Sequence, residues 1–569
     1  MKAGIAKVKV RFKRKEYPLQ GYGSMDNISS GFENDLHARA FIFKSDTSVF
    51  AIIHLECAFI THHLKEKVVQ SFNLSAPAAG LNIHNVLFCA NTTRSAPGGY
   101  SHYPLFNITS RGFLPEVFNA YIAASSEALQ KAWFDLEDSK LRLNASYFDL
   151  DQDVGFNRSL DAFNLNSDVE AQSENNTHLA INRLVRQIII CRSNDNAKGL
   201  LNWFGVQGIS IPQGSGKVHP DNKGFAASLL ENDKSEDKDF IAGFCVEAAG
   251  DVSPNYHGTL KRWPRGRYED HFKSAYFNGF IQFEKSRNMM EDEDLQIPMS
   301  QNLDVVHSFV DFSQVYCDKK YTFNNEEQQT AEAIAGIGFA EGDDIDNPGI
   351  DAFSAMILKN FLQVKRFFNH IRLFNSRRKR VRRRHLEEAH HPKLPMLELQ
   401  DKLILGFSDL SKVPLPYMPS EITAEFRKQY RNGALREHSW APVILPIQIA
   451  RLADVAILGF PGEITTAAGI RLRKTVLEIL EPLGIIDVVI TSCSNEYGGY
   501  VSTYEEYQLQ LFEGASTLFG AHTLSAFQTE FAKLAKELLK PSSDRRIPYA
   551  PQPPEFSQTE LDLRTVPYK

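Results

Sequence analysis

Short apolar runs separated by amphipathic stretches recur near both ends of the chain, and this alternation constrains the fold more than any other feature. Residues 40–43 and 49–53 predict a β-hairpin of buried strands, because a short polar turn separates two apolar runs. Residues 61–72 then predict a helix, and residues 86–90 predict the next strand. This alternation is typical of an α/β fold with mixed α+β layers, in which helices flank mixed sheets.

The same alternation returns late in the chain. Residues 455–458 predict a strand, residues 465–480 a helix and residues 488–490 the next strand. Residues 461–463, Pro-Gly-Glu, follow the first of these strands, and ligands gather at the carboxyl ends of strands in open α/β sheets. Residues 523–539 repeat apolar side chains at three- and four-residue steps, which predicts an amphipathic helix whose aromatic stripe packs into the core.

Composition and charge exclude several classes of function. The net charge is -6 and the isoelectric point is about 6.3, so the chain as a whole lacks the basic surface of nucleic-acid-binding proteins. The six cysteines form no CxxC pair, and several lie in apolar runs, which is typical of buried thiols in a reducing compartment. We find no signal peptide and no run near the roughly 18 apolar residues of a membrane span, so we expect a cytoplasmic protein.

The strongest charge pattern is a basic run at residues 376–385, Ser-Arg-Arg-Lys-Arg-Val-Arg-Arg-Arg-His. We interpret it as an inserted basic loop, although an exposed helix end has the same composition. Such clusters gain about 1 kcal/mol per basic residue near an anionic membrane, so Arg377 to Arg384 are a candidate contact for lipid headgroups or an acidic partner. Nucleic-acid binding lacks support, because no aromatic residues are interleaved with the arginines.

Three short blocks have the composition of functional sites. Residues 250–255, Gly-Asp-Val-Ser-Pro-Asn, form a tight-turn sequence that would expose the Ser253 hydroxyl. The Pro-Gly-Glu triplet at residues 461–463 is the second block, and the third is YGGYVSTYEEYQLQLFEGASTLFGAHT at residues 497–523. Each is a weak signal alone, since a capping serine, a carboxylate at a helix N-terminus or buried tyrosines explain it equally well.

The order of these blocks resembles that of the neutral ceramidase family. Further blocks match at residues 157–159, 202–204 and 221–224. The resemblance covers nearly all of residues 3–565 and implies a ceramidase-like catalytic domain over residues 1–541, followed by a Pro-rich tail at residues 542–569. We find no counterpart of the family's C-terminal β-sandwich domain.

The resemblance also implies a metal site that this chain does not complete. Members of the family cleave the amide of ceramide with a zinc ion held by two His, a Glu and a Tyr, and the last two fall on Glu463 and Tyr500. The two His positions fall on Thr92 and Gln207. Zinc sites usually combine about three protein ligands that include nitrogen or sulfur, so we expect no cofactor unless unrecognised ligands complete the site. The Arg94 guanidinium would repel a divalent cation and could pair with Glu463 instead.

Part of the catalytic apparatus is retained. The resemblance assigns Ser253 to the scissile amide and Arg158 to the same site, as a donor to an oxyanion or to the substrate. Ser253 lacks an evident general base. A family tyrosine that assists at the carbonyl falls on Phe512, which has no hydroxyl. The predicted substrate pocket comprises Arg94, Gln207, Tyr504 and Phe512.

We therefore expect a protein of the N-acylsphingosine amidohydrolase family that keeps a cavity for a ceramide-like lipid amide but lacks zinc-dependent ceramide hydrolysis. One alternative is an active amide hydrolase that uses Ser253 or a relocated metal. The other is a non-catalytic interaction protein whose contact surface is the basic run from Arg377 to Arg384. Zinc content separates the first two hypotheses, and binding to anionic liposomes tests the third.

Overall fold

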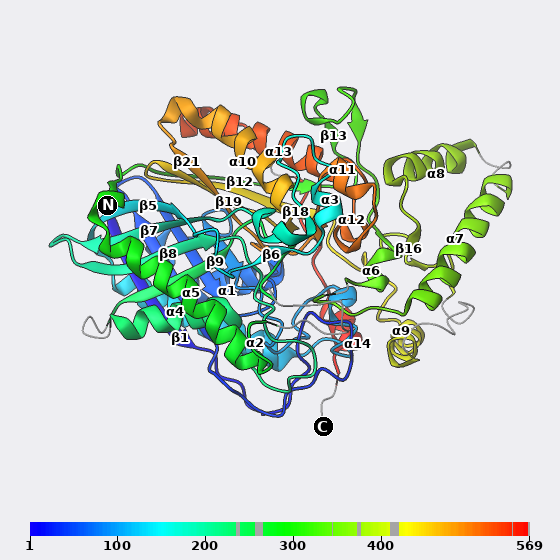
Figure 1. Cartoon of the computed structure of the whole chain (residues 1–569), viewed down its shortest axis with the longest axis horizontal. Helices are drawn as coiled ribbons and strands as arrows, with labels where there is room; N and C mark the ends of the chain where they lie inside the picture. The colour runs from blue at the N-terminus through cyan, green and yellow to red at the C-terminus, as the bar shows by residue number, and fades with distance from the viewer. Residues whose placement is uncertain are drawn as a thin grey trace.

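Two β-sheets lie face to face in the middle of the molecule, and helices cover the outer face of each sheet (Figure 1). This arrangement confirms the predicted fold class of mixed layers. The computed structural model describes residues 1–234, 239–255, 266–343, 345–372, 377–409, 420–548 and 550–566.

The larger sheet is built mainly from the first half of the chain. Its strands follow the order β4-β3-β2-β1-β5-β7-β8-β9, and the predicted hairpin is present as the antiparallel pair β2–β3. Helices α1 and α2 pack on one face through an apolar cluster, and α4 and α5 extend the same helical layer. The bounds are β1 (Lys2–Lys9), β2 (His37–Lys44), β3 (Val49–Leu55), β4 (Val86–Ala90), β5 (Glu137–Tyr147), β7 (Leu184–Arg192), β8 (Ala197–Phe204), β9 (Ile241–Val246), α1 (His62–Ser75), α2 (Pro115–Phe134), α4 (Asp221–Asp233) and α5 (His271–Glu291).

The smaller sheet confirms the strand-helix-strand unit predicted late in the chain. Strands β19 (Val455–Gly459) and β21 (Asp487–Thr491) pair in parallel, and α10 (Thr466–Leu480) connects them. The sheet is completed by β12 (Leu303–Asp311) and β18 (Ile444–Leu452). The predicted C-terminal amphipathic helix is α13 (Thr523–Leu538), and its aromatic stripe is buried beside α10.

The carboxyl ends of strands from both sheets converge near the centre of the molecule. Residues 91–95 follow β4, residues 205–208 follow β8, and residues 247–255 follow β9. From the smaller sheet, β19 leads to a short strand, β20 (Glu463–Ile464), which pairs in parallel with β22 (Tyr500–Val501). The sequence blocks that marked the candidate site therefore meet at one place in the fold, as expected for an α/β architecture.

The basic run does not form the loop that we predicted. Residues 377–390 form helix α8 (Arg377–His390), which stands beside α7 (Ala352–Arg372) at one end of the molecule (Figure 1). Arginine and lysine are good helix formers, and the run contains neither Gly nor Pro to interrupt a helix. Arg382, Arg383 and Arg384 are each paired with acidic side chains of this chain. Residue 376 lies outside the described residues.

The Pro-rich C-terminal segment returns to the domain. Helix α14 (Gln558–Arg564) places the buried Arg564 side chain against the backbone, where its Nε donates to the carbonyl of Ala434 at 3.0 Å. The six cysteines are buried and free, which confirms their prediction as core thiols. In the part of the chain that the structure describes, no helix combines the length and apolar character that crossing a bilayer requires.

Candidate active site

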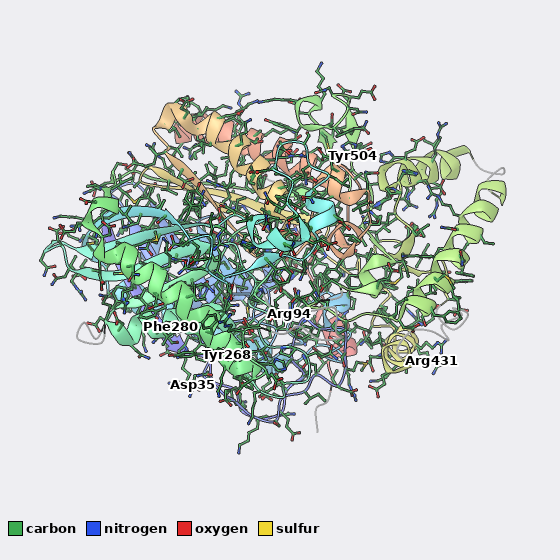
Figure 2. The ribbon with its side chains drawn as sticks, in the orientation of Figure 1. Asp35, Arg94, Tyr268, Phe280, Arg431 and Tyr504 are labelled. Carbon is green, nitrogen blue, oxygen red and sulfur yellow. The ribbon has the colours of Figure 1, made fainter. Side chains whose placement is uncertain are left out.

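A cavity of about 310 Å³ lies where these strand ends meet. Most of its wall is apolar, and its polar end is formed by side chains from the predicted site. Arg94, one of them, lies near the centre of the molecule in the view of Figure 2. The apolar wall includes Phe59, Leu105, Phe106, Ile108, Phe339, Ile350, Met396, Ile422, Phe426 and Leu518, and the polar end includes Thr92, Arg94, Gln207, Glu463, Tyr497 and Tyr500.

The Glu463 carboxylate is held by two donors from this chain. Its Oε2 accepts a hydrogen bond from Gln207 Nε2 at 2.6 Å, and its Oε1 accepts one from the Tyr497 hydroxyl at 2.7 Å. Burial and the adjacent Glu463 charge raise the pKa of Tyr497 well above its ordinary value, so this phenol remains a donor. Sequence reasoning missed the role of Tyr497, whose only signal was its place in the 497–523 block.

The orientation of the Gln207 amide is fixed. Its Nε2 also donates to the carbonyl of Gly250 at 3.2 Å, so this atom faces two acceptors and is assigned as the nitrogen. The other amide atom, Gln207 Oε1, is buried and has no hydrogen-bond partner among the described residues. Unpaired buried acceptors are uncommon in folded proteins, and this one belongs to a side chain that lines the cavity.

Thr92 occupies an unusual backbone conformation. Its φ is 64°, in the left-handed region, where a β-branched side chain is rare. Its Oγ1 accepts a hydrogen bond from the backbone N–H of Gly208 at 2.8 Å. A Cβ added at Gly208 would lie 2.6 Å from the carbonyl oxygen of Asn91, so the two backbones approach closely. This contact brings the Thr92 and Gln207 positions together at the polar end of the cavity.

Arg94 does not pair with Glu463, contrary to our expectation. Its Nη2 donates to the Tyr500 hydroxyl at 3.2 Å, its Nη1 donates to Asn347 Oδ1, and the guanidinium lies 5.5 Å from the Tyr22 ring centroid. Within the described ranges, the polar partners of the Arg94 guanidinium are Tyr500 and Asn347, and neither is a carboxylate. Both oxygens of Glu463 already have donors, which explains why the guanidinium turns to Tyr500. Burial and the Glu463 charge raise the pKa of Tyr500, so its hydroxyl stays protonated.

Ser253 has an acidic neighbour that sequence reasoning missed. Its Oγ donates to Asp346 Oδ1 at 2.9 Å, and Asn255 Nδ2 donates to the same oxygen at 2.7 Å. Burial and the adjacent Asp343 raise the pKa of Asp346. Ser253 is fully buried and does not line the cavity. The only sequence signal for Asp346 was its place in an acidic stretch at residues 341–346.

Arg158 is held by internal partners on all three of its nitrogens. Its Nε donates to Glu513 Oε1, its Nη1 to Asp346 Oδ2 and its Nη2 to the carbonyl of Gly250, each at 2.9 Å. Asp343 lies 3.6 Å from the same Nη1. The Arg158 side chain is fully buried and does not line the cavity, so in this structure it holds carboxylates of the chain itself.

The two aromatic residues predicted in the pocket differ in position. Phe512 lines the cavity and packs edge-on against Tyr500, with ring centroids 5.2 Å apart. Tyr504 does not line the cavity; its ring stacks on Phe323 at 4.6 Å and lies 5.0 Å from His522. Figure 2 shows Tyr504 above Arg94 and well separated from it. The structure therefore places Tyr504 outside this cavity.

Comparison with known proteins identifies the family. The sequence matches the family described as neutral/alkaline non-lysosomal ceramidase, N-terminal, over residues 2–404 and 429–529. The chain belongs to this family. The neutral ceramidase of Pseudomonas aeruginosa is 28% identical over 539 residues, which cover 94% of this chain and 72% of that protein. The neutral ceramidase of Mycobacterium tuberculosis is 27% identical over 536 residues, which cover 91% of this chain and 74% of that protein.

Solved ceramidase structures share the fold. The crystal structure of the Pseudomonas aeruginosa neutral ceramidase aligns with a TM-score of 0.76 at 24% identity, covering 97% of this chain and 76% of that one. A structure described as ceramidase complexed with C2 aligns with a TM-score of 0.78 at 25% identity, covering 97% of this chain and 77% of that one.

The side chains of this ceramidase-family member do not fit a zinc ion. A zinc ligand must present a lone pair, whereas Gln207 presents an N–H to Glu463 and Arg94 presents a cationic guanidinium to Tyr500. Thr92 Oγ1 faces a backbone N–H. No group of three or more His, Cys, Asp or Glu side chains is arranged to hold a metal within the described ranges.

Proposed function

We propose that this protein binds a lipid amide in its cavity and does not hydrolyse it with zinc. The observation that carries the proposal is the pair of hydrogen bonds made by the substituted residues. Gln207 Nε2 donates to Glu463 at 2.6 Å, and Arg94 Nη2 donates to Tyr500 at 3.2 Å. Both retained positions of the family's metal site are therefore bonded to donors of the chain, one of them cationic.

The polar end of the cavity is complementary to an uncharged amide. Arg94 has N–H donors without an acceptor among the described residues, and the Tyr500 proton likewise has none, so both can donate to an amide carbonyl. The unpaired Gln207 Oε1 can accept the amide N–H. Arg94 and Glu463 contribute one positive and one negative charge, so an uncharged head adds no unpaired charge to a buried site. The apolar wall suits an acyl chain.

Zinc content and lipid hydrolysis test this function directly. We expect the purified protein to hold well below about one zinc per chain, and we expect a chelator to leave the binding of a short-chain fluorescent ceramide unchanged, because no zinc ligand set is present. Metal analysis by mass spectrometry and fluorescence titration measure the two quantities. About one tightly bound zinc per chain, lost together with ceramide hydrolysis on chelation, would overturn the proposal.

A matched pair of tyrosine variants tests the head-group assignment. We expect Tyr500→Phe to weaken binding of the fluorescent ceramide by about 3- to 10-fold, because one hydrogen bond of about 0.5–1.5 kcal/mol is lost. Tyr504→Phe is the control, since Tyr504 belongs to the same block but does not line the cavity. Equal losses in the two variants, measured by the same titration, would contradict this assignment.

A second candidate function is zinc-independent hydrolysis by Ser253, which the 2.9 Å hydrogen bond to Asp346 favours. Because Ser253 is buried and does not line the cavity, this candidate requires the amide to reach Ser253 through a rearrangement of the cavity wall. Ser253 Oγ would then attack the amide carbon while its proton passes to Asp346, and that proton would leave with the amine as the C–N bond breaks. Water would hydrolyse the resulting ester. Hydrolysis that resists chelation and disappears in Ser253→Ala would support this candidate. The absence of hydrolysis in both the unmodified protein and Ser253→Ala would support the binding function instead.

A further inference from the structure

Helix α7 exposes apolar side chains along one face. Phe353 is 63% exposed, Met356 is 50% exposed and Val364 is 56% exposed. At about 100° per residue these positions fall within roughly 80° of the helical wheel, and we call them the α7 stripe. The opposite face is buried in the domain through Ala355, Leu358 and Leu362. Core packing therefore explains one face of α7, whereas the stripe stays exposed among the residues that the structure describes.

The α7 stripe lies next to the mouth of the cavity. Helix α7 begins two residues after Ile350, which lines the cavity. Phe339 also lines the cavity and is 38% exposed, so it connects the inside to the surface. Its ring stacks at 6.3 Å on Phe512, which in turn contacts Tyr500 at the polar end. Aromatic side chains therefore connect the head-group end of the cavity to the partly exposed Phe339, and Ile350 places the first turn of α7 beside the cavity.

The charges on α7 are compatible with a lipid surface. The helix contains no acidic residue, and two of its basic side chains are engaged within the chain: Lys359 pairs with Glu341 at 2.6 Å, and Lys365 donates to the carbonyl of Leu405 at 2.6 Å. In Figure 1, α7 stands at the edge of the molecule with α8, clear of the two sheets. A helix with one apolar exposed face and basic residues, but too few apolar residues to span a bilayer, is typical of elements that lie in a membrane interface.

We propose that α7 docks the protein on a lipid bilayer, with the α7 stripe inserted among the headgroups and the cavity mouth against the membrane. The bilayer is the occupant because the stripe begins three residues after Ile350 of the cavity, and the cavity is proposed to take a lipid; in this respect the inference rests on the proposed function. The basic run on α8 does not supply the main contact, since Arg382, Arg383 and Arg384 are paired within the chain. Hydrophobic insertion dominates the binding.

Vesicle flotation of the full chain tests this role. With phosphatidylcholine vesicles, the double variant Phe353→Ser, Met356→Ser is expected to bind at least about tenfold more weakly than the unmodified protein, and binding is expected to survive about 0.5 M salt, because insertion of apolar side chains is not screened. The control is Leu74→Ser, Phe134→Ser, which removes two exposed apolar side chains from α1 and α2. The control is expected to bind like the unmodified protein.

The inference would be overturned if the unmodified protein did not bind vesicles, or if the control variant lost as much binding as the stripe variant. It would also be overturned if salt abolished vesicle binding while the stripe variant still bound. A stripe variant whose only change, by light scattering, was from a dimer to a monomer would overturn it as well. That last result would identify a second copy as the occupant. Titration with the soluble fluorescent ceramide keeps the two proposals apart. The stripe variant is expected to bind the soluble ceramide as tightly as the unmodified protein does. If the unmodified protein failed to bind the soluble ceramide, the proposed function would be contradicted, and vesicle flotation would still test the membrane role of α7.

Discussion

Replacing Arg158 with methionine is expected to destabilise the protein by about 3–5 kcal/mol, the usual cost of removing one partner from a buried ion pair. The guanidinium bonds Asp346 and Glu513 and lies 3.6 Å from Asp343, and all of these side chains are buried or nearly so. Methionine fills most of the volume but neutralises none of the carboxylates. Urea denaturation at pH 7 measures the change in the free energy of unfolding.

The pH dependence of this variant separates charge from packing. In the unmodified protein, burial opposes ionisation of Asp343, but the Arg158 charge outweighs it and lowers the pKa of Asp343. Its contribution to stability is therefore present above the unfolded pKa of about 4 and is lost as pH falls. Without Arg158, the pKa of Asp343 in the folded protein rises above its value in the unfolded chain. The Arg158→Met variant is therefore expected to lose stability as pH rises and to recover it in acid.

A partly exposed arginine provides the control for this prediction. The Arg142 side chain is 29% exposed and pairs with the exposed Asp195, so Arg142→Met is expected to change stability by no more than about 0.5 kcal/mol. If the two variants lost similar amounts of unfolding free energy, Arg158 would act by filling space. The same conclusion would follow if the stability deficit of Arg158→Met did not shrink in acid. A variant that fails to fold at pH 7 but folds in acid would still support the charge argument.

The sequence predicted the position of the site better than its chemistry. Hydrophobic periodicity located the β2–β3 hairpin, the β19-α10-β21 unit and α13, because each is a local pattern with one buried face. The motif blocks located Glu463 and Tyr500, which pair across β20 and β22. Strand ends converge in α/β folds, so placing these blocks after strands was enough to bring them together.

What sequence reasoning missed depends on contacts between distant segments. Asp346 reaches Ser253 across 93 positions of sequence, and no local pattern encodes that hydrogen bond. Charge alone suggested that Arg94 would pair with Glu463, but donors from Gln207 and Tyr497 had already satisfied the carboxylate. Tyr504 shares a block with Tyr500, yet it opens a short helix that turns its ring away from the cavity.

Restoring imidazoles is expected to restore zinc. In the triple variant Thr92→His, Arg94→His, Gln207→His we expect about one zinc per chain, since two nitrogen ligands join Glu463 and Tyr500 and a permanent cation is removed. The backbone supports this outcome. The φ of 64° at position 92 suits histidine better than a β-branched threonine, and the Gly208 contact already brings positions 92 and 207 together.

The double variant Thr92→His, Gln207→His isolates the effect of the guanidinium. With Arg94 retained, zinc is expected to bind at least about a hundredfold more weakly than in the triple variant, because a unit charge at roughly 5 Å costs about 6–7 kcal/mol against a divalent ion at an effective dielectric of about 20, before the side chain moves away. Metal analysis and titration against a competing chelator measure both affinities. A folded triple variant without zinc would mean that Glu463 and Tyr500 no longer hold the inherited geometry, and equal affinities in the two variants would mean that Arg94 swings clear of the site. Tighter binding in the triple variant alone would show that Arg94 keeps zinc out of this cavity even when both imidazoles are present.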